Sequence, residues 1–203
     1  MINHIWGLLH HPDREWRSIN SEGETISHLY THHVLWLAAI PVISAYIGTT
    51  QVGWTLGGEK AVQVSMLDGL WLGIMFYVLI IGAVGFVGGV IHWMARHLPE
   101  RPDLQQCVVF AGYIATPMFL SGLFALYPIA WLCFLAVVSG VCYTGYLLYI
   151  GTPSFLGISR KQGFILSSTT LGIGVLVLEA LLAIVVLLWS MGSDYSLVWM
   201  YMK

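Results

Sequence analysis

Five long apolar runs dominate the sequence, and each is long enough to cross a lipid bilayer. The runs cover, to within a few residues, positions 30–49, 67–95, 105–126, 128–151 and 164–191. A helix of about 20 apolar residues spans the roughly 30 Å of hydrocarbon in a typical bilayer. The pattern therefore predicts an all-α integral membrane protein, built as a bundle of five transmembrane helices.

The composition supports lipid as the solvent for much of the chain. Of the 203 residues, 58% are hydrophobic and only 9% are charged, whereas about a quarter of the residues in an ordinary soluble domain are charged. A soluble core of this size cannot bury so much apolar surface. The formal net charge of -2 gives no indication of nucleic acid as a partner. The lipid bilayer is the expected partner, and contact with other membrane proteins or with a second copy stays open.

The few basic residues predict the orientation of the helices. Cytoplasmic loops of membrane proteins carry an excess of Lys and Arg. Counted along the five runs, six basic residues share one side of the membrane: Arg14, Arg17, Arg96, Arg101, Arg160 and Lys161. Only Lys60 and Lys203 fall on the other side. The sequence therefore places the N-terminus in the cytoplasm and the C-terminus on the opposite side of the membrane.

Residues 1–29 are expected to form short amphipathic helices on the cytoplasmic face. Apolar side chains recur at helical spacing in the first ten residues, but this segment is too short to cross the membrane and is expected to lie on its surface. Ser21 and Glu24 match a capping box that would open the helix leading into the first span. We divide the chain into residues 1–29 and a five-span region of residues 30–203, within one domain.

Four separated segments resemble the bacterial branch of the Yip-domain family. They are HPDREWRSI at residues 11–19, HLYTHH at 28–33, FAGYIATP at 110–117 and YTGYLLYIGTPSFL at 143–156. The resemblance covers nearly the whole chain. It implies a five-span, multi-pass protein of the bacterial inner membrane, with a cytoplasmic N-terminus and a periplasmic C-terminus.

Eukaryotic members of that family act as adaptors for Rab-type GTPases in vesicle traffic, in complexes with other proteins. Bacteria have no such traffic, and this N-terminus lacks the long acidic tail and the DLYGP-type motif of those relatives. The resemblance therefore implies membrane organisation or partner binding, and the GTPase role does not carry over.

Glu179 is the only acidic residue well inside an apolar run. An ionised carboxylate at the centre of a membrane costs at least about 2.5 kcal/mol on insertion scales, so this side chain needs a proton, a partner or water. By depth it is level with Ser44, Thr116, Ser121 and Ser139, which together would form a polar layer at mid-membrane. A hydrogen bond to a neighbouring helix is the structural hypothesis, and a proton, cation or substrate site is the functional one.

Pro117 adds to the functional hypothesis for the third span. Proline removes one helix hydrogen bond and frees a backbone carbonyl, here near Tyr113. Broken helices at mid-membrane are typical of transporters, although ordinary proline kinks are commoner. The candidate ion or substrate site therefore comprises Glu179, Thr116, Pro117, Tyr113 and Ser139.

The histidines near the N-terminus form a second candidate site. His28 and His32 are one helical turn apart, a spacing at which two imidazoles can bind a transition metal. His11 and Asp13 are the candidates to complete the set of ligands. Contact with lipid head groups and backbone carbonyls is the favoured interpretation. We therefore expect no cofactor, with a weak transition-metal site at His28 and His32 as the alternative.

Tyr143, Tyr146 and Tyr149 recur every three residues toward the cytoplasmic end of the fourth span. A structural stripe at the membrane interface is the favoured interpretation, because tyrosine is enriched there. The alternative is a cytoplasmic binding cleft lined by the three rings.

No motif in the sequence indicates catalysis. There is no GxSxG elbow, no HExxH pair, no phosphate-binding glycine loop and no pair of carboxylates in one span. We therefore expect a non-enzymatic membrane protein that organises the membrane or binds a partner. The alternative is a transporter or channel for a small solute, a proton or a metal ion, which would use Glu179 and the mid-membrane polar layer.

The predicted orientation can be tested with reporter fusions or cysteine accessibility. Fusions at Arg101 and Arg160 should report the cytoplasm and a fusion at Lys60 should report the outside, because basic loops are retained in the cytoplasm. Finding Arg101 outside would overturn the five-span arrangement.

Overall fold

Five helices in the described part of the chain are long and apolar enough to cross a membrane, which confirms the predicted all-α, five-span fold. The computed structural model describes residues 2–53, 55 and 63–201. The spans are Ile26–Val52, Met66–Ala95, Leu104–Leu126, Ala130–Phe155 and Arg160–Ser190. Lys60 and Lys203, which the sequence assigned to the far side of the membrane, lie outside the described residues.

Two short helices precede the spans, and the first and third spans are divided into segments. The short helices are α1 (Ile2–His10) and α2 (Pro12–Glu22). The first span joins α3 (Ile26–Leu29), the π-helical turn η1 (Tyr30–Val34), α4 (Leu35–Ile47) and the π-helical turn η2 (Gly48–Val52). The second span is α5 (Met66–Ala95). The third joins α6 (Leu104–Ile114), α7 (Thr116–Ser121) and the 3-10 turn η3 (Gly122–Leu126). The fourth is α8 (Ala130–Phe155), and the fifth lies in α9 (Arg160–Tyr201).

The first span begins at a different cap from the one predicted. α2 continues past Ser21 and ends at Gly23, whose φ of 60° is in the left-handed region that glycine adopts most easily. The N-cap of the next helix is Thr25, whose hydroxyl oxygen accepts a hydrogen bond of 3.2 Å from the His28 N–H. The predicted capping box of Ser21 and Glu24 is therefore wrong, and the Glu24 carboxylate is available for other contacts.

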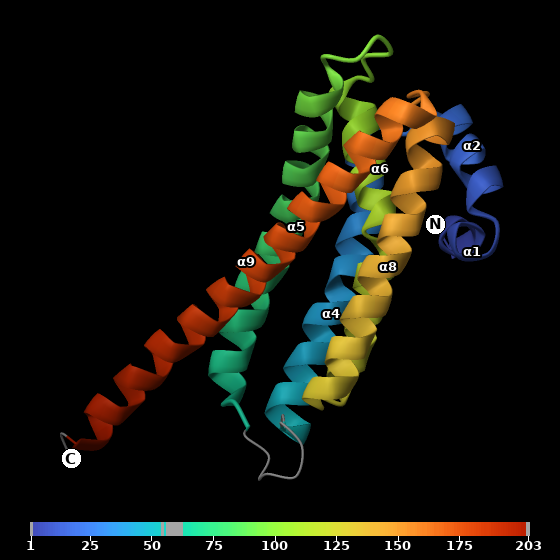
Figure 1. Ribbon diagram of the computed structural model, residues 1–203. Helices are drawn as coiled ribbons and strands as arrows, with labels where there is room; N and C mark the ends of the chain where they lie inside the picture. The colour runs from blue at the N-terminus through green and yellow to red at the C-terminus, as the bar shows by residue number, and fades with distance from the viewer. Residues whose placement is uncertain (1, 54, 56–62, 202–203) are drawn as a thin grey trace.

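The first four spans pack side by side, whereas α9 crosses the bundle obliquely and leaves it toward the C-terminus (Figure 1). α9 packs against α5 and α8. The most apolar stretch within Arg160–Ser190 has none of its residues buried inside the protein. A long part of the fifth span is therefore left for contact with lipid or with another protein.

One end of the molecule gathers α2, the connection at residues 96–103 and the connection at residues 156–159 (Figure 1). The six Arg and Lys residues that the sequence grouped on one side belong to these segments or to the first turn of α9. We call this end of the molecule the basic end.

Trp16 anchors α2 to the bundle. Its side chain is fully buried, and its ring centroid lies 4.9 Å from that of Phe110 in α6 and 5.5 Å from that of Phe155 in α8. Gly151 of α8 makes room for the ring, since a Cβ there would lie 2.7 Å from a Trp16 ring carbon. The apolar side of α2 therefore faces the protein and not the lipid.

α1, which the sequence predicts to lie on the membrane surface, is fixed to the bundle as well. The Leu8 side chain is buried in the same core as Trp16. The Tyr143 hydroxyl of α8 donates to the carbonyls of Leu8 and Leu9, at 3.1 and 2.9 Å. These contacts satisfy backbone groups at the end of a short helix, where they lack helical partners. Trp6, by contrast, is exposed.

The two N-terminal tryptophans allow a matched test of this packing. Trp16→Ala should lower the free energy of unfolding by about 3–5 kcal/mol, because it leaves a cavity between α2 and the spans. Trp6→Ala should change it by no more than about 0.5 kcal/mol, because Trp6 is exposed. Equilibrium unfolding in mixed detergent micelles is the measurement, and equal effects of the two changes would contradict the anchoring role.

Candidate functional site

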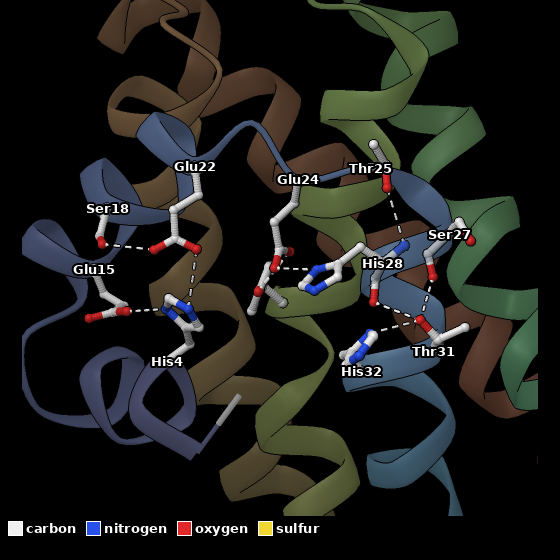
Figure 2. Close-up of polar contacts among 11 residues, drawn as sticks. His4, Glu15, Ser18, Glu22, Glu24, Thr25, Ser27, His28, Thr31 and His32 are labelled. Carbon is white, nitrogen blue, oxygen red and sulfur yellow. Dashed lines mark hydrogen bonds and ion pairs between the residues drawn. The ribbon is translucent and has the colours of Figure 1, made fainter.

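A polar network at the basic end is centred on Tyr113 and Glu24. Tyr113 in α6 is buried, and its hydroxyl donates to a Glu24 carboxylate oxygen at 2.8 Å. Glu24 lies in the link between α2 and α3, with a side chain only 8% exposed. Its other oxygen lies 3.1 Å from Nδ1 of His28, one helical turn along the chain (Figure 2). The network ties the N-terminal link to the third span.

His33 continues this network toward the middle of the bundle. The side chain is buried, and its Nε2 lies 2.9 Å from the hydroxyl oxygen of Thr116 in α7. Its ring centroid lies 4.4 Å from that of Tyr113. Within the described residues, the Nδ1 atom of His33 has no hydrogen-bond partner. The side chain therefore joins the first span to the third by one hydrogen bond and one ring contact.

A second set of contacts ties α1 to α2. His4 of α1 has Nδ1 2.5 Å from a Glu15 carboxylate oxygen and Nε2 3.4 Å from a Glu22 oxygen, both on α2 (Figure 2). The Ser18 hydroxyl donates to Glu22 at 3.3 Å. The His4 ring also lies edge-on to Tyr113, with 6.1 Å between centroids. The sequence did not predict that Glu15 and Glu22 would contact His4. The pairing of Glu24 with His28 could have been predicted, because the two residues are four positions apart.

The four predicted metal ligands do not gather at one place within the described residues, and the metal site stays a prediction. The rings of His28 and His32 stack at 4.3 Å between centroids, as their helical spacing predicts. Each Nδ1 atom, however, faces another partner: Glu24 for His28 and Thr31 for His32. No group of three His, Cys, Asp or Glu side chains is arranged to hold a metal within the described residues.

The two remaining predicted ligands lie on α2 and at its start. His11 is an exposed residue at the N-cap of α2. Asp13 lines a cavity with residues of α8 and α9. The cavity that Asp13 lines does not include His28.

The tyrosines of the fourth span divide among three surroundings instead of forming one cleft. Tyr143 holds the end of α1, as described above. Tyr146 is 49% exposed. The Tyr149 hydroxyl lies 2.8 Å from that of Ser168 in α9, and the Tyr149 ring lines a cavity of ≈ 640 Å³ at the basic end. Tyr143 and Tyr149 therefore line two different cavities, and the three rings do not share one.

The break in the third span is closed by one side chain of the fourth span and by a backbone contact within the third. Pro117 cannot donate to the Tyr113 carbonyl, but that carbonyl accepts the N–H of Ala115. The Ile114 carbonyl accepts a hydrogen bond from the Thr144 hydroxyl of α8 at 3.1 Å. The backbone at the break is thus satisfied inside the protein, which is the arrangement of a structural joint.

The five residues of the predicted ion or substrate site lie in three separate places. Tyr113 and Thr116 belong to the His33 network. Pro117 and Ser139 line a cavity of ≈ 390 Å³ between the third and fourth spans, whose other walls are mostly apolar. Ser139 donates to a backbone carbonyl of its own helix.

Glu179 stands apart from the other predicted site residues. Its side chain is exposed on α9, which packs against α5 and α8. Within the described part of the chain, none of the hydrogen bonds or ion pairs includes its carboxyl group. The helix that carries it leaves the bundle, and this geometry separates it from the third span (Figure 1).

Comparison with known proteins identifies relatives over nearly the full length. The Yip1 domain matches residues 6–182. A protein described as inner membrane protein YohC, from Escherichia coli (strain K12), is 58% identical over 191 residues, which are 94% of this chain and 98% of that protein. The protein of the same description from Escherichia coli O6:H1 matches with the same identity and coverage. No solved structure matches the chain.

The bond between Tyr113 and Glu24 can be tested with a double-mutant cycle. Tyr113→Phe should lower the free energy of unfolding by about 1.5–3 kcal/mol, because it removes a donor from a shielded carboxylate. The same change in a Glu24→Ala background should cost less, with a coupling above about 1 kcal/mol. Tyr77→Phe is the control, because that hydroxyl donates to a neutral backbone carbonyl, of Leu35. Additive effects of Tyr113→Phe and Glu24→Ala would show that the hydrogen bond contributes nothing.

Proposed function

The chain belongs to the Yip1-domain family of membrane proteins, and from that premise we propose that it acts in the inner membrane as a non-enzymatic component that binds a partner membrane protein. The N-terminus lies in the cytoplasm and the C-terminus in the periplasm under this proposal. The gathering of six basic residues at one end of the bundle supports that orientation.

The observation that carries this proposal is the exposure of Glu179 on the membrane face of α9. Glu179 lies in the interior of the span Arg160–Ser190, and its carboxyl group has no partner among the described residues. A lone carboxylate facing lipid is costly, so intramembrane acidic groups normally face a partner or water. A surface that exposes one is therefore suited to bind another membrane helix.

The partner that fits this surface is a transmembrane helix of another protein with a hydrogen-bond donor at the same depth. Polar side chains hold helices together in membranes by hydrogen bonds of about 0.6–2 kcal/mol. Leu176 and Leu187 lie near Glu179 on the helix surface and are 64% and 62% exposed. They would supply apolar contacts on both sides of the polar one.

A transporter is less well supported by the same geometry. Neither of the cavities at Pro117 and at Tyr149 includes Glu179 among its lining residues. The polar groups Thr116, Tyr113 and Thr144 are occupied by hydrogen bonds between helices. A proton or cation pathway would need these groups to face water.

The proposal is tested by cross-linking from α9 in membranes. A photo-reactive residue at Leu176 or Leu187 should capture one defined partner, and Glu179→Leu should reduce that capture about 3- to 30-fold through loss of one interhelical hydrogen bond. A photo-reactive residue at Leu181 is the control, because Leu181 packs against the core of the same chain.

Three results would contradict partner binding through Glu179. The first is capture that does not change in Glu179→Leu. The second is a product of twice the mass of this chain, which would show a second copy on α9. The third is proton or cation flux in liposomes that is present in the wild type and lost in Glu179→Gln, which would favour the transporter.

A further inference from the structure

A cavity of ≈ 640 Å³ opens at the basic end between α2, the end of α8 and the first turns of α9. Its polar walls include Arg17 and Asp13 from α2, Tyr149 and Ser154 from α8, and Arg160 from α9. The site therefore combines side chains of α2 with those of the α8–α9 turn, more than 130 positions further along the chain.

The two arginines give the cavity a positive character. Neither Arg17 nor Arg160 forms an ion pair with a carboxylate among the described residues. Asp13 lines the same cavity without pairing with either guanidinium, so one negative charge stands against two positive ones. Arginine presents a planar fork of donors that matches the oxygens of a phosphate group. The N-terminus of the long helix α9 adds its favourable dipole at the same place.

The backbone positions of both arginines are fixed by buried neighbours. Arg17 follows Trp16, which is fully buried between α6 and α8. Arg160 stands two residues after Ile158, which is 1% exposed. Gly163 allows α9 to approach α8 closely, since a Cβ there would lie 3.1 Å from a methyl carbon of Thr152. A rigid frame of this kind reduces the cost of ordering the site when a ligand binds.

The surroundings of the cavity favour a phosphate that is attached to acyl chains. Its wall includes Phe164, whose side chain is 63% exposed, and the neighbouring Ile165 is 65% exposed. Both belong to the fifth membrane span, so apolar surface for acyl chains lies next to the arginines. Basic pockets between membrane helices at the cytoplasmic side commonly hold lipid head groups.

We propose that this cavity binds the phosphate of an anionic phospholipid head group, with Arg17 and Arg160 as the binding residues and Ser154 and Tyr149 on the same walls. The site is distinct from the membrane face of α9 around Glu179, so it stands independently of the proposed partner. Under this proposal, one lipid is bound at the basic end, between α2 and the membrane spans.

The test uses the full-length protein in mild detergent, with phosphatidylglycerol as the probe and native mass spectrometry and thermal unfolding as readouts. The wild type should retain phosphatidylglycerol and should unfold at a higher temperature when it is added. Arg17→Gln and Arg160→Gln should each weaken binding about tenfold through loss of a charge-assisted contact. Arg96→Gln is the matched control, because Arg96 lies at the basic end outside this cavity and stacks over Trp93.

Two further measurements distinguish the phosphate of a lipid head group from free phosphate. Inorganic phosphate at millimolar concentration should neither raise the unfolding temperature nor displace phosphatidylglycerol; if it does both, with the same dependence on Arg17, the lipid assignment is wrong. Phosphatidylcholine, whose head group carries no net charge, should bind more weakly than phosphatidylglycerol. Equal binding of phosphatidylglycerol by the wild type and the double variant Arg17→Gln/Arg160→Gln, or an equal loss in Arg96→Gln, would overturn the proposal.

Discussion

The burial of the Trp16 side chain between the third and fourth spans is the interaction that fixes α2 at the basic end. Its ring contacts Phe110 and Phe155, and Gly151 is small enough to admit it. Once α2 is fixed there, its other side chains have defined positions. Glu15 and Glu22 of α2 face His4 of α1, while Asp13 and Arg17 of the same helix line the cavity against α8 and α9. The burial of one aromatic ring therefore fixes the helix that carries both the partners of His4 and part of the cavity wall.

The scarcity of water inside a bilayer explains why the polar groups of the third span are paired within the protein. A backbone or side-chain group left without a partner in hydrocarbon costs several kcal/mol in principle. Accordingly, the break before Pro117 is closed by Thr144, and Thr116 is bonded to His33. Glu179, by contrast, is exposed and unpaired among the described residues, and the proposed partner lies outside the chain for that reason. The hydrogen-bonded polar groups of the third span therefore stabilise the fold, whereas the unpaired carboxyl group of Glu179 in the fifth span is the basis of the proposed function.

The two proposed binding surfaces differ in chemistry because they face different surroundings. The membrane face of α9 offers one carboxyl group among exposed aliphatic side chains, which suits a helix already in the bilayer. The cavity at the basic end offers two guanidinium groups next to apolar side chains, which suits the boundary between head groups and acyl chains. α9 contributes to both, so a lipid bound at its first turn and a partner bound along its length would share one helix.

The sequence by itself determined the number of spans, their all-α character and the grouping of the basic residues, because length, hydrophobicity and loop charge are properties of local segments. It also placed His28 beside His32, since helical spacing brings them together. The partners of Glu24 and His33 were decided only by the tertiary structure: Tyr113 and Thr116 lie 89 and 83 positions away in the chain. Depth in the membrane placed Glu179 level with Thr116, but depth does not specify which helices touch. Which helices touch is decided by the packing of α2 on α8 and of α9 on α5, and this packing depends on the shapes of the buried side chains.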